Sequence, residues 1–80
     1  MNQPPLKLLH SEAVLIKLKL EYFRTISTDE LIKSLKPETT NALKTRSDGT
    51  IMDGNHRIKV LRERGFEVDG LPREIWERVK

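Results

Sequence analysis

The first half of the chain has apolar residues at spacings that predict helices, with one ambiguous stretch at 11–24. From Ile16 to Tyr22 apolar and charged residues alternate, as in a half-buried strand. Apolar residues at helical spacing are also present, at Ala13, Ile16, Leu20 and Phe23. Ser11 would cap such a helix and Arg24 would lie near its end, so we favour the helix and keep the strand as the alternative.

A second helix is predicted to begin around Thr28. Thr28 is a good N-cap, and Asp29 and Glu30 would interact favourably with the positive end of the helix dipole. Its buried face would consist of Leu31, Ile32 and Leu35. Pro37 would end the helix, because a proline pushes the preceding residue out of helical geometry.

The second half predicts a β-hairpin over residues 42–53 that runs directly into a third helix. Strands 43–46 and 50–52 would be joined by the turn 47–49, whose Asp-Gly pair is a strong hairpin signal. The third helix would run from Gly54 or Asn55 to Arg64. Its inward side chains would be Ile58, Val60 and Leu61, and Gly65 would be its left-handed stop.

The two ends of the chain carry weaker patterns. Residues 1–10 are expected to form an extended arm anchored through Leu6, Leu8 and Leu9. Residues 71–79 could be a closing strand, which we favour, or a short helix with Pro72 at its first position. The whole chain is therefore expected to be one small α+β domain, residues 1–80, in which a hairpin leads through a turn into a helix.

Composition narrows the functional classes. The 80 residues include no cysteine and two histidines, which excludes disulfides and thiolate chemistry and disfavours a histidine-built metal centre. The longest apolar run, Ala13–Ile16, is too short to span a membrane, and no export signal is visible. We therefore expect a cytoplasmic protein. Its net charge of +3 permits, without demanding, contact with nucleic acid or phosphates.

The turn Asp53-Gly54-Asn55-His56-Arg57 is the candidate functional site. The first turn of a helix has backbone N–H groups without partners in the helix, and its dipole favours anions. Gly54 lets the backbone turn sharply and a ligand approach. The polar side chains of Asn55 and His56 and the guanidinium of Arg57 lie at the same place. Together these features predict an anion-binding turn that suits phosphate.

Asp53 and the cations after the turn have several possible roles. A carboxylate repels a bare anion, so Asp53 would either cap the helix, which we favour, or hold a Mg²⁺ that bridges to phosphate. Lys59 is a weaker candidate ligand contact. Arg62 and Arg64 lie one to two turns further along and are expected to face solvent.

Residues 47–65, SDGTIMDGNHRIKVLRERG, resemble the core of the ParB-like N-terminal domain, whose fold is shared with sulfiredoxin. The similarity is close over these residues and extends weakly to Thr28–Leu35. The resemblance implies that Gly54, Asn55, His56 and Arg57 contact nucleotide phosphates, with Mg²⁺ and CTP or ATP as possible cofactors. Asp53 matches the acidic residue of the family's serine-kinase version.

Two departures from the family limit what the resemblance implies. Sulfiredoxins need a cysteine where this chain has Asn55, so their activity is excluded. Partition proteins carry an arginine-rich segment upstream and a helix-turn-helix domain downstream, and neither is visible in this sequence. The serine kinases need a further upstream carboxylate, for which Glu12, Asp29 and Glu30 are candidates by residue type only.

Three functions remain open from the sequence. The favoured one is a non-catalytic or regulatory module that binds a nucleotide or nucleic-acid phosphate at residues 53–57. The second is an enzyme, either a nucleotide-dependent phosphotransferase or NTPase or a Mg²⁺-dependent nuclease, with Asp53 as metal ligand and His56 as phosphate contact or acid/base. The third is an antitoxin-like protein-interaction module whose aromatic anchors would be Tyr22, Phe66 and Trp76, unless these three pack in the core.

Overall fold

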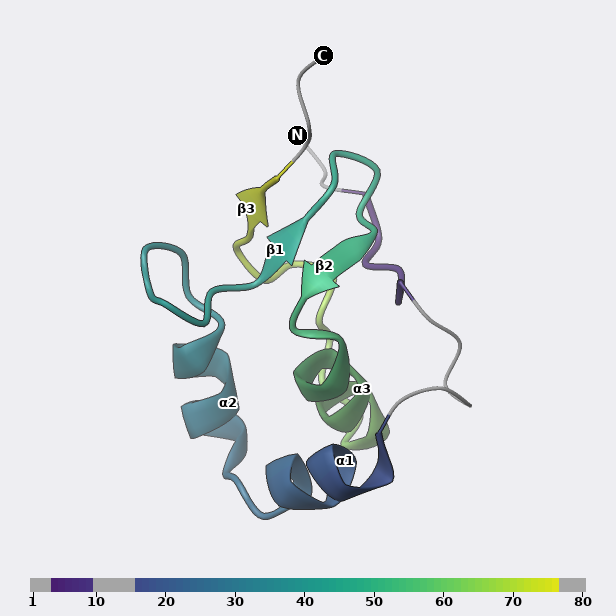
Figure 1. Cartoon of the computed structure of the whole chain (residues 1–80), viewed down its shortest axis with the longest axis vertical. Helices are drawn as coiled ribbons and strands as arrows, with labels where there is room; N and C mark the ends of the chain where they lie inside the picture. The colour runs from purple at the N-terminus through teal and green to yellow at the C-terminus, as the bar shows by residue number, and fades with distance from the viewer. Residues whose placement is uncertain (1–3, 10–15, 77–80) are drawn as a thin grey trace.

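The chain forms a small α+β domain, as the sequence predicted. The computed structural model describes residues 4–9 and 16–76. The elements, in chain order, are α1 (Lys17–Arg24), α2 (Thr28–Ser34), β1 (Lys44–Thr45), β2 (Ile51–Asp53), α3 (Asn55–Glu63) and β3 (Glu74–Ile75). Figure 1 shows the sheet at one end of the molecule and the three helices at the other. None of these helices is long and apolar enough to cross a bilayer.

Helix α1 settles the ambiguous stretch in favour of a helix over Lys17–Arg24. The helix begins after Ile16, which takes the N-cap position with an extended backbone, so the prediction that Ser11 caps this helix is wrong. Residues 10–15 lie outside the described residues. Leu20 is buried, whereas Leu18 and Tyr22, four residues apart on the helix surface, are exposed. Only one stripe of α1 therefore faces the core.

Helix α2 starts as predicted but uses a different cap. Ser27 is the N-cap, and its hydroxyl accepts a hydrogen bond from the Glu30 N–H at 3.2 Å. Thr28 is already helical, which corrects its predicted role as cap. Leu31 and Leu35 are buried as predicted, and Ile32 is partly buried.

The predicted hairpin is confirmed. Strands β1 and β2 pair antiparallel, and the Arg46 N–H donates to the Thr50 carbonyl across the turn at 2.8 Å. Strand β3 adds to the other edge of β1 in parallel, which gives the order β2-β1-β3. The strand predicted for the tail is thus found at Glu74–Ile75, and residues 77–80 lie outside the described part.

The N-terminal arm lies along the hairpin and the segment after α3 and is hydrogen-bonded to both. The Lys7 N–H and carbonyl bond to Gly49 and Ile51, and the Leu6 N–H donates to Asp69 Oδ1 at 2.9 Å. Leu6 is buried, as predicted for an anchor, whereas Leu9 is 38% exposed and anchors little. The described part of the arm therefore forms one wall of the domain.

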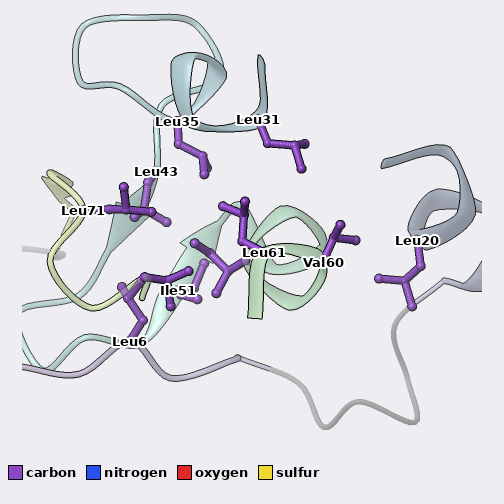
Figure 2. Close-up of a cluster of buried hydrophobic side chains, with 11 residues drawn as sticks. Leu6, Leu20, Leu31, Leu35, Leu43, Ile51, Val60, Leu61 and Leu71 are labelled. Carbon is purple, nitrogen blue, oxygen red and sulfur yellow. The ribbon is translucent and has the colours of Figure 1, made fainter. Parts of the chain in front are cut away.

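The core lies between the sheet, the arm and the helices. Figure 2 shows how leucines from α2, α3, the arm and the residue before β1, Leu43, converge with Ile51 of β2. Of the three aromatic residues that we considered as interface anchors or core residues, two are exposed: Tyr22 by 61% and Trp76 by 59%. Phe66 alone packs against the core, where it is partly buried.

Candidate functional site

The predicted strand-to-helix turn is present. Strand β2 ends at Asp53, Gly54 follows with φ +113°, and α3 begins at Asn55. This backbone conformation favours glycine, and a Cβ at Gly54 would come within 3.2 Å of methyl groups of both Leu35 and Leu43. Gly54 therefore lets the turn pack directly on the core. The N-cap residue Gly54 has no side chain, and among the described residues no side-chain hydrogen bond caps the start of α3.

The start of α3 faces a groove of about 710 Å³ that is also lined by α1 and α2. The apolar wall of the groove comes from α1, α2 and their connection and consists of Leu18, Tyr22, Phe23, Ile26 and Leu31. The polar lining of the groove includes the whole turn from Asp53 to Arg57. The groove thus places an apolar wall beside a helix N-terminus.

Arg57 is the central cation of the groove, and it is 6% exposed. Its Nη1 donates to the hydroxyl of Ser34 at 3.0 Å and to the Ser34 carbonyl at 3.2 Å. Its Nη2 has Asp53 Oδ1 at 3.8 Å, and the described residues offer it no hydrogen bond. Burial lowers the pKa of Arg57 and the Asp53 carboxylate opposes this, but a guanidinium stays charged at neutral pH. Arg57 therefore holds α2 through Nη1, and its Nη2 lies near Asp53.

Asp53 does not cap α3, contrary to our preferred prediction. Its carboxylate lies between two cations, with Lys44 Nζ at 3.8 Å and Arg57 Nη2 at 3.8 Å. The side chain is 53% exposed, whereas that of Lys44 is largely covered and lies over the ring of Trp76. The Asp53 carboxylate thus lies beside Arg57, the cation that we expected to bind the anion of a ligand.

Asn55 and His56 line the groove, but their side chains hold the chain itself. Asn55 is buried, accepts a hydrogen bond from the Leu9 N–H at 2.9 Å and donates to the Ile51 carbonyl at 3.1 Å. His56 accepts a hydrogen bond at Nε2 from the Ile16 N–H at 3.0 Å. The polar side chains that the sequence suggested as ligand contacts therefore position the arm and α1.

The other predicted cations lie outside the groove lining. Lys59 pairs with Glu63 at 3.6 Å. Arg62 donates to the Leu6 carbonyl at 2.6 Å, and Arg64 donates to Thr28 Oγ1 and to two carbonyls, those of Arg24 and Ile26. Arg62 and Arg64 are exposed, as expected, and they also fasten the arm and the α1–α2 connection.

Three polar groove residues could not be assigned from the sequence: Lys19, Ser34 and Asn41. Each is an ordinary polar residue on a helix or loop, and no local pattern marks it. With Lys19 and Arg57 as cations and Glu30 and Asp53 as anions, the formal charges of the lining balance. The groove would thus favour an anion only locally, next to Arg57 Nη2 and the N-terminus of α3. Within the described ranges, no three acidic or histidine side chains are placed to hold a metal ion.

No protein-family model, curated protein or solved structure matches this chain.

Proposed function

We propose that the domain binds a phosphate-bearing ligand, a nucleotide or a nucleic-acid phosphate, with its anion at the start of α3 and its remainder along the apolar wall. The resemblance of residues 47–65 to the ParB-like domain supports this proposal. So does the groove, which combines an uncapped helix start, a buried guanidinium and apolar surface.

The observation that carries the proposal is the burial of Arg57 together with its Nη2, which is unbonded among the described residues. A largely buried guanidinium that faces a groove and whose Nη2 has no hydrogen bond from the described residues is suited to an incoming oxygen anion. Its hydrogen bonds to Ser34 fix its orientation in advance. Little side-chain ordering would then remain to be completed on binding.

Asp53 competes with the ligand in this proposal. The carboxylate lies 3.8 Å from Arg57 Nη2, where it repels a phosphate and partly neutralises the guanidinium. We expect Asp53→Asn to tighten phosphate binding by about two- to fivefold at low salt, because the carboxylate is half exposed and therefore screened.

The test is an amide NMR titration with inorganic phosphate, CTP, ATP and a short DNA duplex, each with and without Mg²⁺. Binding as proposed shifts the amides of Gly54–Arg57 and those of Leu18 and Tyr22, and Asp53→Asn binds more tightly than the native chain. Glu67→Gln is the matched control. It removes one negative charge outside the groove lining, at a residue whose carboxylate accepts from the Asp69 N–H.

The outcomes distinguish the alternatives. DNA binding that weakens steeply with salt identifies nucleic acid as the ligand. Binding that needs Mg²⁺ and is lost in Asp53→Asn supports the enzyme hypothesis, in which Asp53 holds the metal. If no ligand shifts Gly54–Arg57 at millimolar concentration, the proposal is wrong and a protein-interaction role of the domain becomes the better hypothesis.

A further inference from the structure

The first turn of α1 is held by an unusual acceptor, the imidazole of His56. Ile16 is the N-cap of α1, the helix has no side-chain cap, and its first turn contains no acidic residue. The Ile16 N–H donates instead to His56 Nε2, 40 residues further along the chain, at 3.0 Å. A side chain of α3 thus fixes the N-terminal end of α1.

The bond requires a neutral imidazole. Nε2 can accept only while it carries no proton, and after protonation both ring nitrogens are donors. The Ile16 N–H would then face another N–H, so the contact would become repulsive. Histidine is the side chain that ordinarily changes charge between pH 5 and 8.

The charged and titratable side chains that share the groove with His56 come from four elements. They are Lys19 and Tyr22 of α1, Glu30 of α2, Asp53 of β2 and Arg57 of α3. Two are anions and two are cations, so their formal charges balance. The hydrogen bond from the Ile16 N–H fits the neutral imidazole.

The C-terminal end of α1 is held by groups of a different kind. Arg24 makes a two-point contact with Glu63, at 3.0 and 2.7 Å. This contact lowers the pKa of Glu63 and raises that of Arg24, so the pair stays ionised at mildly acidic pH. Arg64 also donates to the Arg24 carbonyl at 3.0 Å. Acidification to pH 5.5 thus affects one end of α1 and leaves the other in place.

We propose that His56 and the Ile16 N–H form a pH-operated clasp. Neutral His56 holds the first turn of α1 against α3, and protonated His56 releases it while the Arg24–Glu63 pair keeps the other end attached. The released turn carries Leu18 and Lys19, which line the groove, so acidification opens the groove at that end. The clasp is a property of the fold and does not depend on the proposed ligand.

The experiment follows amide NMR shifts and hydrogen exchange of the ligand-free protein from pH 8 to 5.5. We expect the Ile16 amide to shift with the same midpoint as the His56 imidazole and its protection factor to fall about tenfold. The amides of Thr25 and Ile26, beyond the Arg24–Glu63 pair, stay unchanged. No response of the Ile16 amide to His56 titration overturns the proposal.

Three variants separate the clasp from other pH effects. His56→Gln offers an acceptor that does not titrate, so its Ile16 amide should stay protected throughout the pH range. His56→Ala lacks the acceptor and should show an unprotected Ile16 amide already at pH 8. His10→Gln removes the other histidine of the chain and should leave the transition unchanged. A transition that persists in His56→Gln, or disappears in His10→Gln, assigns the response to another group and refutes the clasp.

Discussion

Thr45 is a fully buried residue of β1 whose hydroxyl oxygen has no hydrogen-bond partner among the described residues. A buried polar group without a partner keeps the cost of its lost hydration. Valine has almost the same shape and replaces the hydroxyl with a methyl group. We expect Thr45→Val to raise the free energy of unfolding by about 1 kcal/mol, which corresponds to about 4–8 °C in Tm for a domain of this size.

Thr39→Val is the matched control for this prediction. The Thr39 hydroxyl is exposed and donates to the Lys36 carbonyl at 2.8 Å, so its removal deletes a bond that is made. Thermal and urea unfolding of both variants should show a gain for Thr45→Val alone. A loss of stability in Thr45→Val would mean that its hydroxyl has a partner in solution.

Arg57 illustrates why residue roles are hard to assign from the sequence. Its place in the first turn of a helix followed from the local pattern, and this was confirmed. Its burial was not predictable, because its hydrogen-bond partner Ser34 is 23 residues away and carries no distinctive signal. The same holds for Asn55 and His56, whose partners lie in the arm and before α1. Such roles depend on tertiary contacts that no local spacing encodes.

At the scale of elements, the hairpin and α3 were predictable because their signals are local. An Asp-Gly turn, a run of apolar residues and a terminal glycine all act within a few residues. The cap of α2 was misassigned because Ser27 and Thr28 are adjacent and both are good caps. The N-terminal boundary of α1 was also misassigned, since Ile16 at the N-cap position gives no sequence signal and its N–H bonds to His56.

The junction between β2 and α3 gives a prediction about Gly54. Its φ of +113° strains any other residue, and an added Cβ would also meet Leu35 and Leu43 at 3.2 Å. We expect Gly54→Ala to lower the free energy of unfolding by about 3 kcal/mol, from backbone strain and overpacking together. Urea unfolding measures this cost.

Gly65, just after α3, is the control for the strain alone. Its φ is +79°, and no atom lies within 4 Å of an added Cβ. Gly65→Ala should cost about 1 kcal/mol, since only the left-handed backbone is penalised. Equal costs at the two glycines would show that the turn does not pack tightly on the core.

At the scale of the whole molecule, three carboxylates tie segments together. Glu63 accepts from Arg24 and so joins α3 to α1, and this hydrogen bond lowers the pKa of Glu63. The Glu38 N–H donates to Glu74 and lowers its pKa, which joins β3 to the loop after α2. The Thr50 N–H does the same for Asp48 within the hairpin turn. All three interactions are stronger while the carboxylates are ionised.

These lowered pKa values make the stability of the domain depend on pH. A carboxylate with a lowered pKa in the folded state adds stability above its ordinary pKa, and this stability is lost as the pH falls through the folded value. The ordinary values are 4.5 for Glu63 and Glu74 and 3.8 for Asp48, so the stability that these three carboxylates contribute should be constant from pH 7 to about 5 and fall steadily below, as urea unfolding measures. Because the groups are exposed, added salt should reduce the effect.

Glu63→Gln tests whether the contact between α1 and α3 carries a share of this acid sensitivity. Glutamine can accept one hydrogen bond from Arg24 but cannot titrate, so the variant should be less stable than the native chain at pH 7 and lose less stability between pH 5 and 3. Glu67→Gln changes a carboxylate that, within the described part of the chain, accepts a hydrogen bond from the nearby Asp69 N–H, and it should keep the native slope. If the two variants have the same slope, the Arg24–Glu63 pair does not hold α1 in solution. Its role as the acid-resistant attachment of that helix would then be lost as well.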